Sequence, residues 1–356
     1  MEPFIGADRV VRIGHWGNVQ YREYTLPYMS RNGTDYQEIL EEAEIVFGTL
    51  TGCGGNNEMK NLPPGHFDLT VVDECGQALE AAVWAVVRFT SKLLLAGDHL
   101  QLPPFVLPTQ PDVRAALSLS MMERLVTRFD PPVVSLLETQ YRMNYRIMAW
   151  SSHTFYEGKL KAAPSVEDRT LAQLPGVRDC KTTRQEIRLV DTGGVMAEQK
   201  STDPRRSSKA NPGEAGVILA EVRKLVTMGV KPENIGVITF YALQADILRH
   251  NIHYKHPGVE IHTVDGFQGS EKEVILVSPV CSNTEGHLGF LKEHTRLNVA
   301  VTRAKRQLVI VADRKTVSGD YAWNSLMCYI EEKGHVCDGS TVQSDTRVPR
   351  WLGLEM

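Results

Sequence analysis

Eight short apolar runs, separated by longer segments with helical spacing, are the feature that most constrains the fold of this chain. They are EIVFGTL (44–50), LTVVDE (69–74), KLLLAGD (92–98), EIRLVDT (186–192), IGVITF (235–240), VEIHTV (259–264), EVILVSPV (273–280) and QLVIVAD (307–313). Runs that are apolar throughout are typical of parallel strands covered on both faces by helices. The sequence therefore predicts an α/β fold with mainly parallel sheets.

The segment 211–229 is the clearest of the intervening helices. Asn211 is the expected N-cap, Pro212 the first-turn proline and Glu214 the acid of a capping box. Apolar residues follow at helical spacing, and Gly229 ends the pattern. We expect this helix to pack on the sheet, and nothing in it calls for a functional explanation.

The length of 356 residues predicts two domains, each with a core of its own. A boundary is expected near 126–135, where TRFDPPVV interrupts the pattern with two prolines. The polar segments 160–180 and 200–211 read as loops, and the chain is expected to become irregular after residue 334.

Charge and cysteine content limit the classes of function. The net charge is −4, so any binding of nucleic acid must come from local patches. The six cysteines are scattered without a CxxC pair, which argues for reduced thiols and against structural zinc. No apolar run approaches the roughly 18–20 residues of a membrane span, and the N-terminus lacks the features of a signal peptide. We expect a cytoplasmic or nuclear protein with no membrane contact.

Two of the apolar runs end in polar groups that suit phosphate chemistry. Asp73 and Glu74 follow LTVV, while Asp98 and Gln101 stand in AGDHLQLPP. The carboxyl ends of parallel strands face the crevice where such sheets bind ligands, and an aspartate there can hold Mg²⁺. The alternative is that strands leaving a core simply end in polar turns. Two such motifs at successive strand ends favour the phosphate site.

Three further motifs carry arginine or acidic residues. ETQYRM (138–143) contains Arg142, and HTVDGFQGSEKEV (262–274) contains Glu271 after a Gly-bounded turn. RLNVAVTRAKRQLVIVAD (296–313) places Arg303, Lys305 and Arg306 on an expected helix that leads into a strand. Each has an ordinary explanation, such as a solvated arginine or a basic helix end that interacts with the helix dipole. Five motifs in one order are not explained in this way.

The series DECGQ, GDHLQLPP, QYRM, TVDGFQGSE and LNVAVTRAK resembles motifs II to VI of superfamily 1 helicases. It is most similar to the 5′-to-3′ subgroup that contains the immunoglobulin mu-binding and nonsense-mediated-decay helicases, over about residues 9–316. The resemblance implies two RecA-like P-loop NTPase domains. Residues 1–130 would be a partial first domain with motifs II and III, residues 131–333 the second domain with motifs IV to VI, and residues 334–356 an irregular tail.

The resemblance also implies ATP and Mg²⁺ as cofactors and a role for individual residues. Asp73 would coordinate Mg²⁺, Glu74 would activate water and Gln101 would report the γ-phosphate. Arg142 and Arg303 would act as arginine fingers. Further contacts to the nucleotide would come from Gln77, Asp98, Tyr141, Gln268, Gly269 and Glu271. Single-stranded DNA or RNA would run near Thr49, Pro103, Tyr241, Thr263 and Ser282.

The chain departs from this family in its phosphate-binding loop. A Gly-rich turn ending in GK[ST] cradles the β- and γ-phosphates in such motors, and residues 1–356 contain none. TGCGGNN (51–57) has no lysine followed by serine or threonine, and we interpret it as a flexible loop. We therefore expect a first domain truncated at its N-terminus, two strands with unpaired edges, poor stability of that domain and no ATP turnover by this chain alone.

Three classes of function remain to be separated. The first is an ATP-dependent helicase or translocase, monomeric and associated with ribonucleoprotein partners. The second is a regulatory or nucleic-acid-binding module that has lost ATP hydrolysis. The third, an unrelated nucleotide-binding enzyme such as a dehydrogenase, is disfavoured because no GxGxxG follows a first strand. The motifs do not separate DNA from RNA, since contacts to sugar and phosphate dominate.

Overall fold

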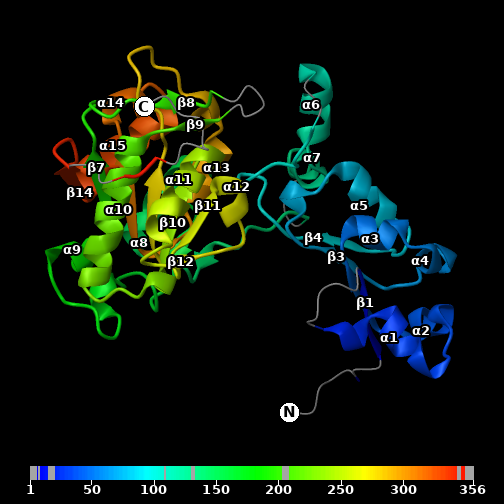
Figure 1. Ribbon diagram of the computed structural model, residues 1–356. Helices are drawn as coiled ribbons and strands as arrows, with labels where there is room; N and C mark the ends of the chain where they lie inside the picture. The colour runs from blue at the N-terminus through cyan, green and yellow to red at the C-terminus, as the bar shows by residue number, and fades with distance from the viewer. Residues whose placement is uncertain are drawn as a thin grey trace. The chain divides into compact units, whose positions relative to one another are not determined.

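The computed structural model describes residues 6, 9–14, 21–107, 110–129, 133–202, 208–342 and 346–348. The chain divides into two compact parts, which we call unit 1 (Met1–Ser135) and unit 2 (Leu136–Met356) (Figure 1). Both are built from helices and mainly parallel strands, so the predicted α/β class is confirmed.

A six-stranded parallel sheet forms the centre of unit 2 (Figure 1). Its order is β11 (Glu260–Thr263), β10 (Ile235–Thr239), β12 (Lys272–Ser278), β13 (Ala304–Ala312), β7 (Ile187–Asp191) and β14 (His335–Asp338). The four strands β7, β10, β12 and β13 are almost wholly buried, as expected of runs that are apolar throughout.

Helices cover both faces of this sheet. The helices α10 (Pro212–Thr227) and α11 (Ala242–Ile252) form one core with alternate strand residues such as Val237, Leu276 and Val309. The alternating residues between them point to the opposite face. On that side α8 (Tyr145–Phe155), α13 (His294–Val301) and α15 (Tyr321–Lys333) pack against one another and the sheet. The shorter elements are β5 (Thr139–Gln140), β6 (Lys161–Ala162), α9 (Lys181–Arg184), β8 (Gln199–Lys200), β9 (Lys209–Ala210), α12 (Val264–Phe267) and α14 (Arg314–Val317).

Unit 1 has two separate two-stranded parallel sheets. β1 (Val10–Ile13) pairs with β2 (Ile45–Gly48), and β3 (Thr70–Val72) pairs with β4 (Leu93–Leu95). Its helices are α1 (Leu26–Met29), α2 (Tyr36–Glu42), α3 (Leu50–Gly55), α4 (Asn57–Asn61), α5 (Glu80–Val87), α6 (Pro111–Ser118) and α7 (Met121–Val126). Among the described residues of unit 1, neither sheet has a third strand.

The interpretation of residues 51–57 as a flexible loop was wrong. Residues 50–55 form α3, which is capped by the Thr49 hydroxyl accepting a hydrogen bond from Gly52 N at 3.0 Å. A Cβ on Gly54 would lie 2.6 Å from the Cβ of Ala85 on α5. The glycine therefore allows two helices to approach closely rather than providing flexibility.

Three other expectations need correction. Residues 335–338 are not irregular, because His335–Asp338 form β14 by pairing with β7. Lys305 and Arg306 lie in β13, because α13 already ends at Val301. The expected loop at 200–211 contributes to the short β8–β9 pair, and its residues 203–207 lie outside the described part. Among the described residues, no helix combines the length and apolar character needed to cross a bilayer.

One buried ion pair joins the sheet of unit 2 to its helical layer. Arg188 of β7 is 1% exposed and donates to Glu221 Oε2 of α10 at 2.7 Å. Burial acts to raise the pKa of Glu221, but the hydrogen bond and charge of Arg188 hold it below its usual range. A buried pair of this kind tolerates the loss of one partner poorly, since the other charge remains in the core.

We expect Glu221→Gln to lower the free energy of unfolding of unit 2 by about 3 kcal/mol, because it leaves the Arg188 guanidinium uncompensated. Urea denaturation followed by circular dichroism measures the change. Asp179→Asn is the matched control, since it breaks an arginine pair that is exposed on the surface. Equal effects of the two substitutions would contradict the importance of the buried pair.

Candidate functional site

In unit 1, the polar residues predicted at the ends of β3 and β4 lie at the same edge of the sheet that these strands form. Val72 of β3 is in register with Leu95 of β4, so the segments that follow the two strands leave the sheet side by side. Cys75 N donates to Ala96 O at 2.9 Å and joins these segments directly. The structure thus brings Asp73 and Glu74 to the same edge as Asp98 and Gln101.

Hydrogen bonds within each segment orient the acidic side chains. Glu74 N donates to Asp73 Oδ1 at 2.9 Å, and Gln77 Nε2 donates to Glu74 Oε2 at 3.0 Å. Glu74 has a φ of 49°, in the left-handed region that residues other than glycine seldom adopt. Such strain costs of order 1–3 kcal/mol and is concentrated at functional sites. The exposed carboxylates of Asp73 and Glu74 are therefore held in a defined arrangement.

The segment after β4 is also held by hydrogen bonds to its own aspartate, Asp98. Asp98 accepts hydrogen bonds from Leu100 N at 2.9 Å and from Gln101 Nε2 at 2.8 Å. The two loops touch through backbone atoms, since a Cβ on Gly76 would lie 2.6 Å from Asp98 O. Glycine is therefore required there for the two loops to approach.

The donor chemistry of this edge fits Mg²⁺. The ion prefers oxygen ligands, and it is commonly held by one or two carboxylates together with substrate phosphates and water. Asp73 offers such a carboxylate, and the described residues contain no group of three or more histidine, cysteine or acidic side chains suited to a metal ion. A single carboxylate that shares the ion with a phosphate ligand is consistent with both facts.

Arg142 of unit 2 is held by an acidic partner. The turn before α8 is closed by Gln140 Oε1, which accepts from Arg142 N at 2.9 Å and from Met143 N at 2.7 Å. The Arg142 guanidinium pairs with Glu271, which also binds Lys305 Nζ at 2.7 Å. Burial acts to raise the pKa of Glu271, but Lys305 and Arg142 together hold it below its usual range.

Other residues expected at the nucleotide differ in accessibility. Tyr141 is 71% exposed, and Gly269 has a φ of 81° that favours glycine. The amide oxygen of Gln268 is buried without a hydrogen-bond partner in the described structure.

Arg303 is only 3% exposed, and its guanidinium donates to Val299 O at 3.1 Å and to Thr302 Oγ1 at 2.9 Å. Arg303 thus points into unit 2, whereas Arg142 is partly accessible.

In unit 2, the residues expected near nucleic acid lie at or after the carboxyl ends of strands, whereas Glu271 and Arg303 precede β12 and β13. Thr263 ends β11, Tyr241 follows β10 and Ser282 follows β12. Tyr241 is 4% exposed, because its ring packs against Phe290 and its hydroxyl lies 3.6 Å from Cys281 Sγ. Ser282 is 2% exposed. Two of these three side chains are therefore buried in this structure.

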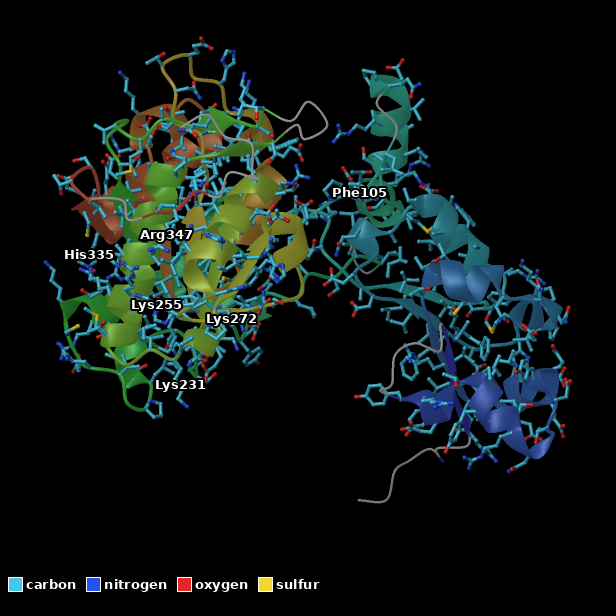
Figure 2. All side chains as sticks on the ribbon, viewed as in Figure 1. Phe105, Lys231, Lys255, Lys272, His335 and Arg347 are labelled. Atoms are coloured by element: carbon cyan, nitrogen blue, oxygen red, sulfur yellow. The ribbon has the colours of Figure 1, made fainter. Side chains whose placement is uncertain are left out.

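In unit 1, Thr49 caps α3 and Pro103 is exposed. Sequence reasoning missed Phe105, which follows the two prolines and is 79% exposed (Figure 2). An exposed aromatic ring beside a phosphate motif suits base stacking. Its position directly after GDHLQLPP is the sequence signal that could have identified it.

Two acids that hold Ser282, the buried Asp313 and the partly buried Glu198, were also missed. Ser282 Oγ donates to Asp313 Oδ2 at 2.9 Å, and Ser282 N donates to Glu198 Oε2 at 3.0 Å. These residues border a cavity of about 1,340 Å³ that includes Lys200 and Lys315. Carboxyl ends of parallel strands line it, which is where such sheets bind ligands.

Glu214 was expected only to cap α10, yet it reaches the turn after β12. It is fully buried, and its Oε2 accepts from Ser278 Oγ at 2.6 Å and from Val280 N at 2.9 Å, while Oε1 has no partner among the described residues. Burial raises the pKa of Glu214 to about 8. Val280 has a φ of 75°, an outlier for a β-branched residue. Glu214 therefore holds a strained turn two residues before Ser282.

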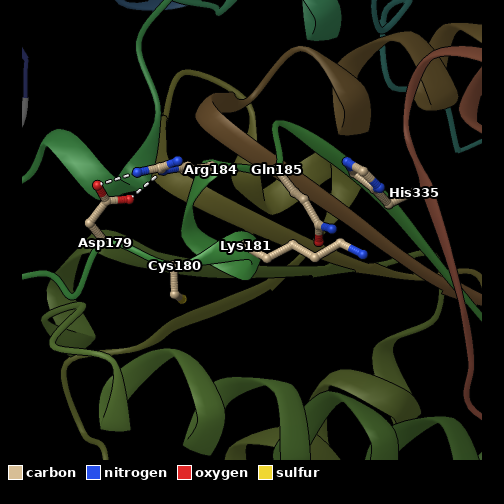
Figure 3. Close-up of a pocket in the computed structure, with 6 residues that line it drawn as sticks. All are labelled: Asp179, Cys180, Lys181, Arg184, Gln185 and His335. Carbon is tan, nitrogen blue, oxygen red and sulfur yellow. Dashed lines mark hydrogen bonds and ion pairs between the residues drawn. The ribbon is translucent and has the colours of Figure 1, made fainter.

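A second cavity, of about 470 Å³, lies elsewhere in unit 2 and is lined by Asp179, Cys180, Lys181, Arg184, Gln185 and His335 (Figure 3). Arg184 pairs with Asp179 at its rim. A hydrogen bond from Thr183 lowers the pKa of the Cys180 thiol. None of the residues predicted from the sequence lies in it, and we assign it no role in the site.

Comparison with protein families finds two AAA domains. One family model, described as an AAA domain, matches residues 117–315, which is more than half of the chain, and another of the same description matches residues 18–109. Among curated proteins, the mouse DNA-binding protein SMUBP-2 is 43% identical over 298 residues, which are 83% of this chain and 30% of that protein. DNA polymerase alpha-associated DNA helicase A of Schizosaccharomyces pombe is 35% identical over 322 residues, 89% of this chain and 47% of that protein.

The yeast ATP-dependent helicase NAM7 is 35% identical over 314 residues, covering 85% of this chain and 31% of its own length. The chain thus spans between about a third and half of the length of these relatives. Among solved structures, an arterivirus nonstructural protein 10 helicase in complex with DNA is 15% identical. It covers 78% of this chain and 45% of its own, with a TM-score of 0.38.

Glu214 predicts a pH dependence of stability in unit 2. Its folded pKa of about 8 lies above the ordinary value of 4.5, so the folded state binds the proton more tightly. The resulting contribution to the stability of the folded state is fully present below pH about 4.5 and is lost as pH rises through about 8. In the unchanged chain, we expect the free energy of unfolding to fall by a few kcal/mol between pH 5 and 8. We expect Glu214→Gln to abolish this fall.

Urea denaturation at each pH measures this effect. Glu332→Gln is the control, because Glu332 is an exposed acid of the same unit. If the stability of Glu214→Gln falls with pH as steeply as that of the unchanged chain, the proton on Glu214 does not control this pH dependence.

Proposed function

The chain belongs to the superfamily 1 helicases, and from this membership we propose that it is the core of an ATP-dependent 5′-to-3′ motor on single-stranded DNA or RNA. The observation that carries the proposal is the pairing of β3 with β4. It gathers Asp73, Glu74, Asp98 and Gln101 at one sheet edge. Acidic and amide groups at such an edge can hold Mg²⁺ and orient the attacking water in phosphoryl transfer.

In this proposal, Asp73 holds Mg²⁺, which neutralises charge on the phosphates when bound. Glu74 orients the attacking water and accepts its proton. Gln101 reports the state of the γ-phosphate to Asp98 through their hydrogen bond. Gln77 fixes the Glu74 carboxylate. Tyr141, Gln268, Gly269 and Glu271 are assigned to contacts with the nucleotide.

Arg142 is proposed as an arginine finger, because its guanidinium is partly exposed and already paired with a carboxylate. In exchange for Glu271, phosphate oxygens would offer the planar guanidinium a bidentate ion pair. Arg303 is proposed as a second finger. That role requires its buried guanidinium to leave Val299 and Thr302.

Single-stranded nucleic acid is assigned to Thr49, Pro103 and Phe105 in unit 1 and to Thr263, Tyr241 and Ser282 in unit 2. Hydroxyls, backbone groups and the exposed ring of Phe105 suit contacts to sugar, phosphate and base faces, which do not depend on sequence. The buried hydroxyls of Tyr241 and Ser282 must become accessible for this role. We propose a monomer that acts with ribonucleoprotein partners in the cytoplasm or nucleus. The described cysteines are all free, as in a reducing compartment.

A second candidate is a regulatory module that binds nucleic acid without ATP turnover. The observation that favours it is the lack of a GxxxxGK[ST] motif in residues 1–356. That motif supplies the main contacts to a triphosphate. Assays of the chain by itself and of a chimera distinguish the two candidates.

For the chain by itself, we expect binding of a labelled oligo(dT) or oligo(U) strand that weakens as salt rises. We expect no ATP hydrolysis above that of Glu74→Gln, because the phosphate loop is lacking. Fluorescence anisotropy and a coupled phosphate-release assay measure the two properties. Lack of binding at low salt would contradict the assigned nucleic-acid residues, and stimulated turnover would contradict the need for a separate loop.

For the chimera, residues 9–316 replace the aligned part of the Schizosaccharomyces pombe relative, which retains its own upstream sequence. We expect DNA-stimulated ATP hydrolysis, lowered at least about 100-fold by Glu74→Gln and by Arg142→Ala. Glu42→Gln, an exposed acid of unit 1, is the control. A folded chimera that binds DNA but does not hydrolyse ATP would favour the regulatory module.

A further inference from the structure

A cavity of about 470 Å³ lies in unit 2 where β7 and β14 begin. Gln185 comes two residues before β7, and His335 is the first residue of β14, which pairs with β7 in parallel. The rest of the wall comes from the segment just before Gln185, and it consists of Asp179, Cys180, Lys181 and Arg184 (Figure 3). The cavity is therefore at the amino ends of strands, whereas the residues assigned to nucleic acid lie at carboxyl ends.

The side chain of Gln185 points to a ligand in this cavity. Gln185 is 8% exposed and borders the cavity, yet its carboxamide has no hydrogen-bond partner within the described part of unit 2. Its backbone is held in place, because Gln185 O accepts a hydrogen bond from Gln307 Nε2 at 2.6 Å. A buried amide without a partner costs free energy comparable to a lost hydrogen bond. The carboxamide therefore offers a donor group and an acceptor group to a molecule that enters the cavity.

Basic side chains surround this amide. Lys181 and His335 are exposed, and neither side chain forms an ion pair or a hydrogen bond with another described residue. Arg184 binds Asp179 at the rim, with 2.7 Å between Nη2 and Oδ2. Since Asp179 balances Arg184, the charge of Lys181 remains in excess even when His335 is neutral. A surplus of positive charge raises the local concentration of anions.

Cys180 supplies a nucleophile to the wall of the cavity, where it is partly buried. Cys180 N donates to Thr183 Oγ1 at 3.0 Å, so the thiol is held beside this hydroxyl. Hydrogen bonds from Thr183 are the main cause that lowers the pKa of the Cys180 thiol, and Thr182 and Arg178 add to them. The thiolate is the reactive form of cysteine, and reactive cysteines are typical of partly exposed, electropositive surroundings.

The other five cysteines differ from Cys180 in accessibility or in surroundings. Burial raises the pKa of three thiols, which belong to Cys53, Cys75 and Cys281. Cys328 is exposed and Cys337 is partly buried, but neither of them borders the cavity. Cys180 thus combines a lowered thiol pKa with a cavity that favours anions.

We propose that this cavity binds an anionic peptide disulfide of the glutathione class and that Cys180 forms a mixed disulfide with it. The Cys180 thiolate attacks one sulfur of the reagent, whose S–S bond breaks as the new S–S bond forms. The other half of the reagent leaves as a thiolate and takes a proton from water. Cys180 is oxidised and the leaving half is reduced, so the reaction needs no further oxidant.

Each part of such a reagent has a counterpart in the wall of the cavity. Its carboxylates pair with Lys181 and His335, and one of its peptide groups forms hydrogen bonds with the carboxamide of Gln185. Ion pairs at an exposed site contribute little binding free energy, so the positive charge mainly raises the rate of encounter, and the disulfide bond then retains the ligand. The inference is independent of the proposed motor function, which uses none of these residues.

The test exposes the full, reduced chain at neutral pH to three disulfides: anionic glutathione disulfide, neutral hydroxyethyl disulfide and cationic cystamine. Mass spectrometry of peptides measures the rate of adduct formation at each cysteine. We expect Cys180 to react with glutathione disulfide at least about tenfold faster than the exposed Cys328. The ratio of the two rates should fall from the anionic to the neutral and then to the cationic reagent.

Two substitutions in the wall separate recognition of the reagent from the reactivity of the thiol. We expect Lys181→Gln to slow the reaction of Cys180 with glutathione disulfide about threefold and to leave the reaction with hydroxyethyl disulfide unchanged. The same split is expected of Gln185→Met, which fills a similar space without the amide. Lys231→Gln is the matched control, because Lys231 is an exposed lysine of unit 2 that does not border the cavity. Circular dichroism checks that each variant is folded.

Three results would overturn the proposal. The first is a rate at Cys180 no higher than at Cys328 with glutathione disulfide. The second is the same ratio of these rates for all three reagents, which would show that the cavity does not select an anion. The third is an unchanged rate with glutathione disulfide in both folded variants, Lys181→Gln and Gln185→Met.

Discussion

Parallel strand pairing is the constraint on which the rest of the structure depends. It places all carboxyl ends at one edge of a sheet and all amino ends at the other. In unit 1 this brings Asp73 beside Asp98, because β3 and β4 run in register. In unit 2 it sorts the predicted residues into two groups. Glu271 and Arg303 precede β12 and β13, whereas Tyr241, Thr263 and Ser282 follow or end β10, β11 and β12.

The two units differ in how this constraint is supported. Unit 2 has six paired strands with helices on both faces, and most of its strand residues are buried. Such a core can hold a buried charge pair such as Arg188–Glu221 and a strained residue such as Val280. Unit 1 holds its strained Glu74 on a two-stranded sheet only. The acidic pair of unit 1 is thus positioned by local hydrogen bonds, while the turn before Ser282 is positioned by the core.

Charge pairing also decides which arginines are accessible. Arg142 and Lys305 share Glu271, so one carboxylate holds two cations at a partly exposed site. Arg303 instead donates to the carbonyl of Val299 at the end of α13 and is buried. Two arginines to which the family resemblance gives the same role therefore differ in accessibility and in hydrogen-bond partners. Arg142 is held by a carboxylate at a partly exposed site, whereas Arg303 is held by a carbonyl and a hydroxyl in the interior.

Local patterns in the sequence determined the α/β class, the strand positions, the N-cap at Asn211 and the five motifs, because apolar runs and capping residues act over a few neighbours. The motif residues at strand ends followed from the same patterns. The tertiary structure alone decided the helix at 50–55, the strand at 335–338 and the burial of Tyr241 and Arg303. Three of these involve a partner distant in sequence: Ala85 for Gly54, β7 for β14, and Phe290 for Tyr241. Arg303 is bonded to its neighbours Val299 and Thr302, and its burial comes from the surrounding core of unit 2. Glu214 is the sharpest case, since its sequence context indicates only a helix cap, while Ser278 and Val280, more than sixty positions away, give it its buried hydrogen bonds.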